Sequence, residues 1–320
     1  MTTYKEIFGK YVKNYSSDPS SDIEGQVWYN TTSGTFKSNV IGAGSWASGG
    51  NMGTARMQLA GCGTQTAALG FGGYVTGAVN NTEEYDGSAW TGGGNLGTAT
   101  RLLGGAGTQT AGLVFGGITT VNTATTQEYD GSAWAGGGNL STARYGIVGA
   151  GIQTAGLAIG GTTTVQVANT EEYDGSAWTA GGNLNTARES AGGAGTQTAG
   201  LAFGGYSTVQ TNATEEYDGS AWTTGGNLNV ARNQITGGGI QTSAFAAGGE
   251  TTAPAATGAT EEYNGSSWSI STSMSTARRF LAGAGIKTAG LVFGGFTTAV
   301  TAATEEYSGS APVTKTITTS

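Results

Sequence analysis

The sequence contains no histidine, one cysteine (Cys62) and only 3 prolines among its 320 residues. The absence of histidine removes the commonest general base and the commonest metal ligand. A single cysteine excludes an internal disulfide and a zinc site built from cysteines. We therefore expect neither a metal site nor a cofactor, and we expect Cys62 to be a small strand residue.

Long apolar runs and clustered basic residues are also missing. No stretch of 18 apolar residues occurs, so the sequence predicts no membrane insertion. Residues 1–24 contain three lysines but no apolar segment and no small-residue cleavage site, so they do not form a secretory signal, and we expect synthesis in the cytoplasm. The formal net charge of −8 argues against nucleic acid as a partner, because phosphate binding needs clustered Lys and Arg.

Glycine, in contrast, supplies 60 residues, and much of it belongs to a repeat of about 44 residues. Each copy carries a diglycine, then a tyrosine, then a tryptophan five positions after the tyrosine. The tryptophans are Trp46, Trp90, Trp134, Trp178, Trp222 and Trp268. The diglycines begin at Gly72, Gly116, Gly160, Gly204, Gly248 and Gly294.

One unit, Ser141–Trp178, divides into four short strands. We expect them near residues 145–149, at 155–159, at 169–173 and around Trp178. Asp174-Gly175 is a hairpin signal between the last two. No stretch shows a sustained helical period, so the sequence predicts an all-β protein.

A four-stranded sheet of this size cannot bury both faces alone, whereas sheets arranged around an axis bury them against each other. Six diglycines therefore predict a six-bladed β-propeller over residues 46–311, between an N-terminal arm (1–45) and a C-terminal tail (312–320). The last repeat has Pro312 where the tryptophan belongs. We expect the strand around Trp46 to complete the sixth blade beside residues 301–307.

The repeat resembles the kelch family in its diglycine after an apolar strand, its Tyr and Trp five residues apart, and an Arg ten residues after the Trp. The likeness covers about residues 46–311 and implies a propeller.

The opening segment resembles another group. GQVWYNTTSGTFK (Gly25–Lys37), with the Gly-Ser-Trp stretch at 44–46, is similar to the leader of structural proteins of marine tailed phages. That resemblance implies a virion protein, associated with the tail, a tail fibre or the particle surface.

An arginine series and a series of paired glutamates follow the repeat. The arginines are Arg56, Arg101, Arg144, Arg188, Arg232 and Arg278, with Arg101 one place late. They form either an anion- or glycan-binding ring near the axis or internal Arg–Glu pairs, and we favour the pairs. Adjacent residues of a strand point to opposite faces, so only one Glu of each pair can meet the arginine.

The loops between the second and third strands vary more than the other turns. Their first residues are Tyr74, Ile118, Thr162, Tyr206, Glu250 and Phe296. In a four-stranded meander these loops share one face with the loops that join successive blades. That face is either a binding and display surface or simply tolerant of change.

Residues 1–45 lack the repeat, and their four lysines balance four acidic residues. They contain the aromatic residues Tyr4, Phe8, Tyr11, Trp28, Tyr29 and Phe36, which are typical of protein interfaces. Residues 26–39 read as a hairpin. We expect this arm to dock on another virion protein or on a second copy of the chain, the alternative being that it folds over its own propeller.

The leading hypothesis is a non-catalytic structural or attachment protein of a phage particle that works through protein–protein interaction. The alternative is a lectin-like propeller that binds host-surface glycans at several equivalent sites. A glycosidase or lyase is the least favoured function, because five Glu-Glu pairs and one Gln-Glu pair at equivalent positions do not define one active site.

Overall fold

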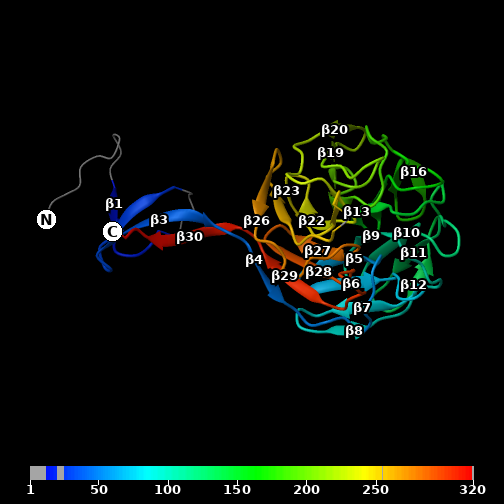
Figure 1. The fold of residues 1–320 in the computed structure, drawn as a ribbon, viewed down its shortest axis with the longest axis horizontal. Coiled ribbons are helices and arrows are strands. Elements are labelled where there is room, and N and C mark those ends of the chain that lie inside the picture. The colour runs from blue at the N-terminus through cyan, green and yellow to red at the C-terminus, as the bar shows by residue number, and fades with distance from the viewer. Residues whose placement is uncertain (1–11, 20–24, 254, 319–320) are drawn as a thin grey trace. The chain divides into compact units, whose positions relative to one another are not determined.

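The computed structural model describes residues 12–19, 25–253 and 255–318. The chain forms two compact units, of which the larger is Ser45–Gly309 and the smaller joins Met1–Gly44 to Ser310–Ser320. The described residues form strands, turns and loops without a helix. The all-β expectation is confirmed, and the larger unit has a propeller-like architecture (Figure 1).

The described part of the larger unit contains six antiparallel four-stranded sheets. The first three are β5 (Ala60–Thr64), β6 (Ala67–Phe71), β7 (Thr82–Tyr85), β8 (Trp90–Gly92); β9 (Gly104–Gly107), β10 (Gly112–Phe115), β11 (Thr126–Tyr129), β12 (Trp134–Gly136); and β13 (Val148–Ile152), β14 (Ala155–Ile159), β15 (Thr170–Tyr173), β16 (Trp178–Ala180). The others are β17 (Gly192–Gly195), β18 (Gly200–Phe203), β19 (Thr214–Tyr217), β20 (Trp222–Thr224); β22 (Thr236–Ile240), β23 (Ser243–Ala247), β25 (Thr260–Tyr263), β26 (Trp268–Ser271); and β27 (Ala282–Ile286), β28 (Ala289–Phe293), β29 (Thr304–Ser308), β4 (Ser45–Ser48).

The last of these sheets joins distant parts of the chain. Strand β4 pairs with β29, and Trp46 lies opposite Tyr307. The predicted pairing of the Trp46 strand with residues 301–307 is therefore confirmed. Trp46 thus takes the place opposite Tyr307 that Trp90 takes opposite Tyr85 in the first sheet.

The first strand of each sheet lies innermost, and neighbouring inner strands contact each other in the order β5, β9, β13, β17, β22, β27 and back to β5. Figure 1 shows these strands around a common centre, with β8, β12, β16 and β20 at the rim. The crowding explains their glycines. A Cβ built on Gly149 would lie 2.0 Å from the carbonyl oxygen of Gly105 on the next inner strand.

The predicted start of these inner strands is wrong by about three residues. In the third sheet the strand begins at Val148 rather than at Tyr145, and Val148 pairs with Ile159. The chain bends just before the strand, because Gly146 has a φ of +64°. Tyr145 pairs instead with Thr162, in the loop after strand β14.

Aromatic residues pack between sheets. The indole Nε1 of Trp178 donates to Thr126 Oγ1 of the preceding sheet at 2.9 Å, and its ring lies 4.9 Å from that of Phe115. The diglycines allow the sheets to approach closely. Gly161 N donates to Arg188 O at 2.9 Å, and a Cβ on Gly160 would lie 2.5 Å from the same oxygen.

The smaller unit is a four-stranded sheet in the order β1 (Lys13–Tyr15), β2 (Val27–Asn30), β3 (Thr35–Gly42) and β30 (Ala311–Thr316). The predicted hairpin is confirmed as β2 and β3. The expectation of a separate C-terminal tail at 312–320 is wrong, since β30 pairs with β3 along its length. Pro312 is tolerated there because β30 is an edge strand, which leaves one row of backbone groups without a ladder partner.

Candidate functional site

Five of the six arginines form buried ion pairs. The partner of each is the first residue of the next Glu-Glu sequence along the chain. Arg188 Nη2 lies 2.7 Å from Glu215 Oε1, and Arg278 Nη2 lies 2.8 Å from Glu305 Oε1. Arg56–Glu83, Arg144–Glu171 and Arg232–Glu261 repeat the arrangement. Each of these arginines is at most 1% exposed. The Arg–Glu interpretation is confirmed for these five, and their burial rules them out as members of an anion- or glycan-binding ring near the axis.

These pairs also fasten the chain around them. Glu215 Oε2 accepts a hydrogen bond from Asn185 N at 2.7 Å, and Arg188 donates to the carbonyl oxygen of Ala213 at 3.0 Å. Burial lowers the pKa of Arg232 to about 10, which still leaves it charged at neutral pH. The ion pairs therefore hold the loop between two sheets against the next sheet.

Arg101 is the exception among the predicted arginines. Thr100 takes the buried place in the second repeat, and Gln127 replaces the glutamate, accepting from Gly97 N at 2.9 Å. Arg101 instead donates to Gln58 Oε1 at 3.0 Å and lies over the ring of Tyr74. Its guanidinium therefore contacts the loop that begins at Tyr74 and is not part of the buried series.

The second glutamate of each pair has a partner that sequence reasoning missed. Tyr217 Oη donates to Glu172 Oε1 of the preceding sheet at 2.5 Å, and burial raises the pKa of Tyr217 to about 12. The equivalent bonds are Tyr85–Glu306, Tyr129–Glu84, Tyr173–Glu128, Tyr263–Glu216 and Tyr307–Glu262. The constant spacing of about 45 residues between Glu and Tyr was the available signal.

The six predicted loop residues lie where the sheets' connecting loops meet. Each forms an isolated or short antiparallel backbone pairing with a residue of the loop that precedes the inner strand. That partner comes directly after the buried arginine of the repeat, or after Thr100 in the second repeat. The pairs are Met57–Tyr74, Arg101–Ile118, Tyr145–Thr162, Glu189–Tyr206, Asn233–Glu250 and Arg279–Phe296. In the fifth repeat the pairing extends to a small sheet of β21 (Arg232–Asn233) and β24 (Glu250–Thr251). We call these twelve residues the loop face.

Thr162 and Glu250 are the two predicted loop residues that are buried, with 5% and 8% of their surface exposed. The most exposed apolar side chains of the same loops are three valines that sequence reasoning did not select. Val121, Val165 and Val209 are 61–69% exposed at the loop tips. A partner that approaches this face meets these tips as well as Tyr74, Tyr206 and Phe296.

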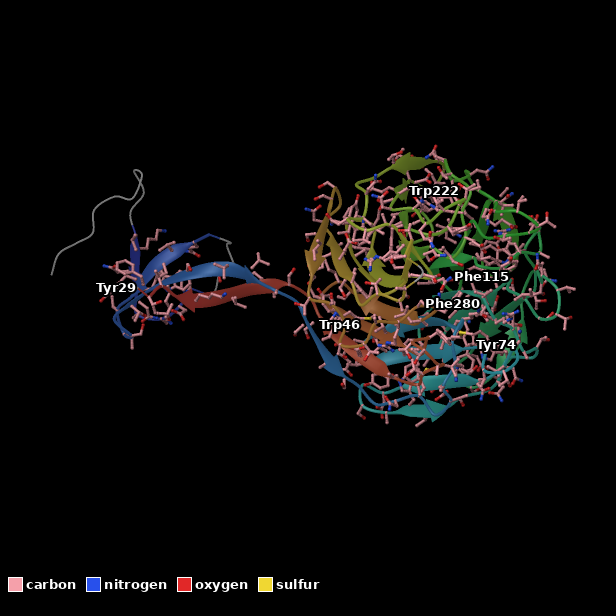
Figure 2. The ribbon with its side chains drawn as sticks, in the orientation of Figure 1. Tyr29, Trp46, Tyr74, Phe115, Trp222 and Phe280 are labelled. Carbon is pink, nitrogen blue, oxygen red and sulfur yellow. The ribbon has the colours of Figure 1, made fainter. Side chains whose placement is uncertain are left out.

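A closed ring of six backbone hydrogen bonds lies beside the loop face. Each repeat contributes one residue, which comes directly after the first loop-face residue of that repeat. Its backbone N–H donates to the carbonyl oxygen of the equivalent residue in the preceding repeat, at 2.7–3.1 Å, and the first repeat donates to the last. The members are Gln58, Leu102, Gly146, Ser190, Gln234 and Phe280, which we call the axial ring. All six have positive φ, between 51° and 64°. Figure 2 shows Phe280 near the centre of the unit, while Trp222 lies near its rim.

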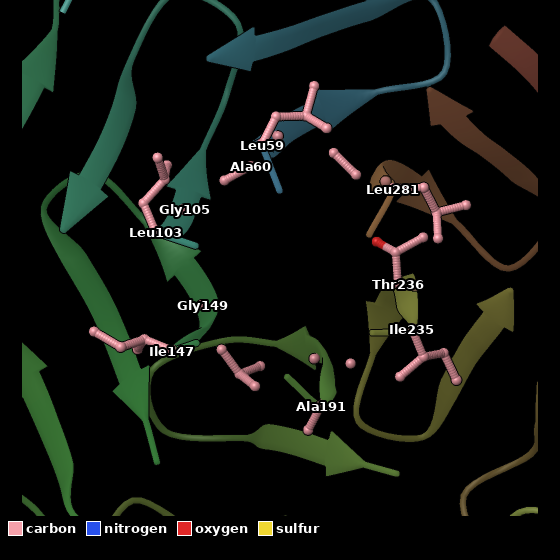
Figure 3. Close-up of a pocket in the computed structure, with 17 residues that line it drawn as sticks. Leu59, Ala60, Leu103, Gly105, Ile147, Gly149, Ala191, Ile235, Thr236 and Leu281 are labelled. Atoms are coloured by element: carbon pink, nitrogen blue, oxygen red, sulfur yellow. The ribbon is translucent and has the colours of Figure 1, made fainter. Parts of the chain in front are cut away.

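Below the axial ring, the inner strands enclose a small central cavity of about 130 Å³ (Figure 3). Its side chains are mostly apolar. They include Leu59, Leu103, Ile147, Ala191, Ile235 and Leu281. Cys62 is buried elsewhere, in the core between sheets, and burial raises the pKa of its thiol to about 12. The wall of the central cavity therefore consists mainly of apolar side chains and glycine backbone, and none of the described charged residues lines it.

In the smaller unit the predicted anchor residues separate into two groups. Trp28 is 1% exposed, and its Nε1 donates to Asp18 at 3.2 Å, so the expectation that it contacts a partner is wrong. Tyr29 and Phe36 are half-buried, with ring centroids 5.1 Å apart. Tyr4, Phe8 and Tyr11 lie outside the described residues.

Tyr29 and Phe36 share one face of the small sheet with several aliphatic residues, as the strand register requires. Three of these aliphatic side chains are 39–44% exposed, namely Val27, Val313 and Ile317. Val40 shares this face, paired with Val313, and the paired Ser38 and Lys315 lie on it between Val40 and Phe36. We call the six apolar residues the apolar sheet face.

A scan against protein-family models gives no match, and no curated protein matches the chain. Within the ranges that the structure describes, no helix is long and apolar enough to cross a membrane. The same ranges contain no cluster of three or more His, Cys, Asp or Glu side chains suited to a metal ion.

Proposed function

We propose that this chain is a non-catalytic structural or attachment protein of a phage particle, associated with the tail or the particle surface. One observation supports the proposal that the protein is not an enzyme. The Glu and Tyr side chains of each repeat, and five of the six arginines, are bonded between or within sheets. The residues that differ between repeats gather on the loop face. This division suits a rigid support that displays a binding surface. The phage setting rests on the likeness of Gly25–Lys37 to phage leaders.

Part of this proposal is that Ser45–Gly309 is a six-bladed, kelch-like propeller. Three sets of six bonds support it: the Tyr–Glu bonds, the axial ring, and the Trp–Thr bonds between sheets. In each set the final bond links the first and last repeats. Trp90 Nε1, for example, donates to Thr304 Oγ1 at 2.9 Å.

The smaller unit is the proposed anchor, and the apolar sheet face is its contact surface. A single four-stranded sheet leaves a face in water unless something covers it. On the opposite face, the side chains of Trp28, Asn30 and Lys37 all donate hydrogen bonds to the Asp18 carboxylate. We propose that the apolar sheet face docks on another virion protein or on a second copy of the chain.

Incorporation into particles tests the anchor. Deleting residues 1–38 is expected to leave a folded larger unit that no longer joins the particle. The double variant Tyr29→Ser/Phe36→Ser makes the same test without a truncation, and Thr314→Asn, on the opposite face of the sheet, is its matched control. Normal occupancy of the truncated protein would show that residues 1–38 are not the anchor.

Display by the loop face is tested separately. Charge-introducing variants Tyr74→Glu, Tyr206→Glu and Phe296→Glu are expected to weaken host adsorption while leaving incorporation and thermal stability unchanged. The alternative function, a lectin-like propeller, is favoured by one observation, a polar hollow in the loop face.

A further inference from the structure

A hollow of about 340 Å³ opens on one sector of the loop face. Loop-face residues of the third, fourth and fifth repeats line it together with members of the axial ring. The residues that matter for its chemistry are Tyr145, Glu189, Tyr206, Asn233, Gln234 and Phe280. Its volume lies in the range of small-molecule sites in proteins.

The hollow is rich in hydrogen-bond acceptors. Asn233 Oδ1 and Gln234 Oε1 are buried and accept no hydrogen bond within the described part of the chain. Asn233 is only 7% exposed. Glu189 accepts one long bond, 3.4 Å, from Gln166. Glu189 is half-buried, so its carboxylate is the acceptor that a ligand in the hollow can reach, and it favours a ligand that brings hydroxyl or N–H groups.

Charge in the hollow disfavours an anion. Glu250 is neutralised by an ion pair with Arg279 and accepts from Gln234 Nε2 at 2.9 Å. Glu189 has no ion pair among the described residues, and its carboxylate contributes one negative charge. A carboxylate or sulfate group on a ligand would be repelled by Glu189.

A glycine makes room for that carboxylate. Gly146 is the one member of the axial ring without a side chain, and a Cβ built there would lie 2.9 Å from Glu189 Oε2. Glu189 can therefore lie against the ring beside Ser190. The first two repeats offer no equivalent, since they place Met57, Arg101 and Ile118 at the corresponding positions.

We propose that this hollow binds one unit of a neutral, hydroxyl-rich glycan. Sugar hydroxyls would donate to Glu189, and the C–H face of the sugar would pack on Tyr145, Tyr206 or Phe280. The inference rests on the proposed role of the loop face as a binding surface. It differs from a lectin with several equivalent sites, because the residues that form this hollow occur together in one sector.

The test uses the purified full-length chain on a glycan array that carries neutral, sulfated, uronate-containing and amine-bearing glycans. The neutral glycan with the strongest signal is then titrated by calorimetry. Glu189→Ala and Tyr206→Ala are expected to weaken its binding about tenfold or more. The matched control is Ile118→Ala, the position of Tyr206 in the second repeat, which should leave affinity within about twofold. Unchanged melting curves establish that all three variants fold.

Three results would overturn the proposal: no neutral glycan binds, only amine-bearing glycans bind, or Ile118→Ala weakens binding as much as the two hollow variants. Failure of the proposed function is separate. Glu189→Ala should still be incorporated into particles, and absence of the wild-type chain from particles would contradict the phage role while leaving the glycan measurement intact.

Discussion

Two regions of the larger unit use the same repeat in opposite ways. Between the sheets, the Tyr–Glu and Trp–Thr contacts recur in every repeat, and the Arg–Glu pair recurs in five. On the loop face, one equivalent position carries Met, Arg, Tyr, Glu, Asn and Arg in the six successive repeats. The comparison teaches that the buried contacts fix the architecture, whereas the loop face is free to carry function.

The second repeat shows how far the buried contacts can change. Thr100 and Gln127 replace the ion pair there, and Gln127 still accepts from Gly97 N. The loop is therefore held without charge, because an amide oxygen can replace a carboxylate as acceptor. The chain therefore holds the loop between two sheets in two ways, with an Arg–Glu ion pair in five repeats and with Gln127 in the second.

The largest expected effect comes from opening the ring of sheets. Deleting residues 1–50 removes β4 and exposes the packing surface of Tyr307. We expect the melting temperature to fall by about 10 °C or more, because losing one large aromatic alone costs about 3–5 kcal/mol. Deleting residues 1–38, which retains β4, is the control in scanning calorimetry. Equal melting temperatures for the two truncations would contradict closure by Trp46.

Breaking one buried ion pair should have the next largest effect. Arg188→Thr leaves the Glu215 carboxylate buried without its partner, which costs about 3–5 kcal/mol. The double variant Arg188→Thr/Glu215→Gln reproduces the second repeat and should recover most of that loss. Urea unfolding measures both. A double variant no more stable than the single one would show that the Thr–Gln arrangement works only in the second repeat.

Alkaline pH should weaken the Tyr–Glu bonds. The pKa of Tyr85, Tyr129, Tyr173, Tyr217 and Tyr263 is raised to about 12, against an ordinary value of 10.0. Because the folded pKa lies above the unfolded one, this contribution is fully present below pH ~10 and is lost as the pH rises toward ~12.

Absorbance of tyrosinate and circular dichroism, followed together, check this expectation. The late phase of tyrosine ionisation should coincide with the loss of β-sheet signal, and Tyr217→Phe should reduce the amplitude of that phase. Full ionisation near pH ~10 with the fold intact would contradict it.

The smallest effect is expected on the loop face. Val165→Ser changes a side chain that is 64% exposed at a loop tip. We expect the free energy of unfolding to change by less than about 0.5 kcal/mol. Ile159→Ser, in the buried strand of the same repeat, is the contrasting variant and should be strongly destabilising. A large effect of Val165→Ser in urea unfolding would mean that the tip packs on something within the fold.

The sequence by itself determined the all-β class, the four strands of each repeat and the pairing of Trp46 with Tyr307. These follow from local periodicity, turn residues and the missing tryptophan at Pro312. The hairpin at residues 26–39 was also readable, because alternating strands flank a short polar turn.

Only the tertiary structure decided which groups meet across sheets. The axial ring joins residues of five different types, with only Gln58 and Gln234 alike, so no sequence pattern predicted it. The burial of Thr162 and Glu250, and the space that Gly146 leaves for Glu189, depend on how the loops of neighbouring repeats fold over each other. Strand β30 was missed because its partner β3 lies about 270 residues earlier in the chain. A strand's local sequence shows that it can pair, but the partner is chosen by the packing of the whole unit.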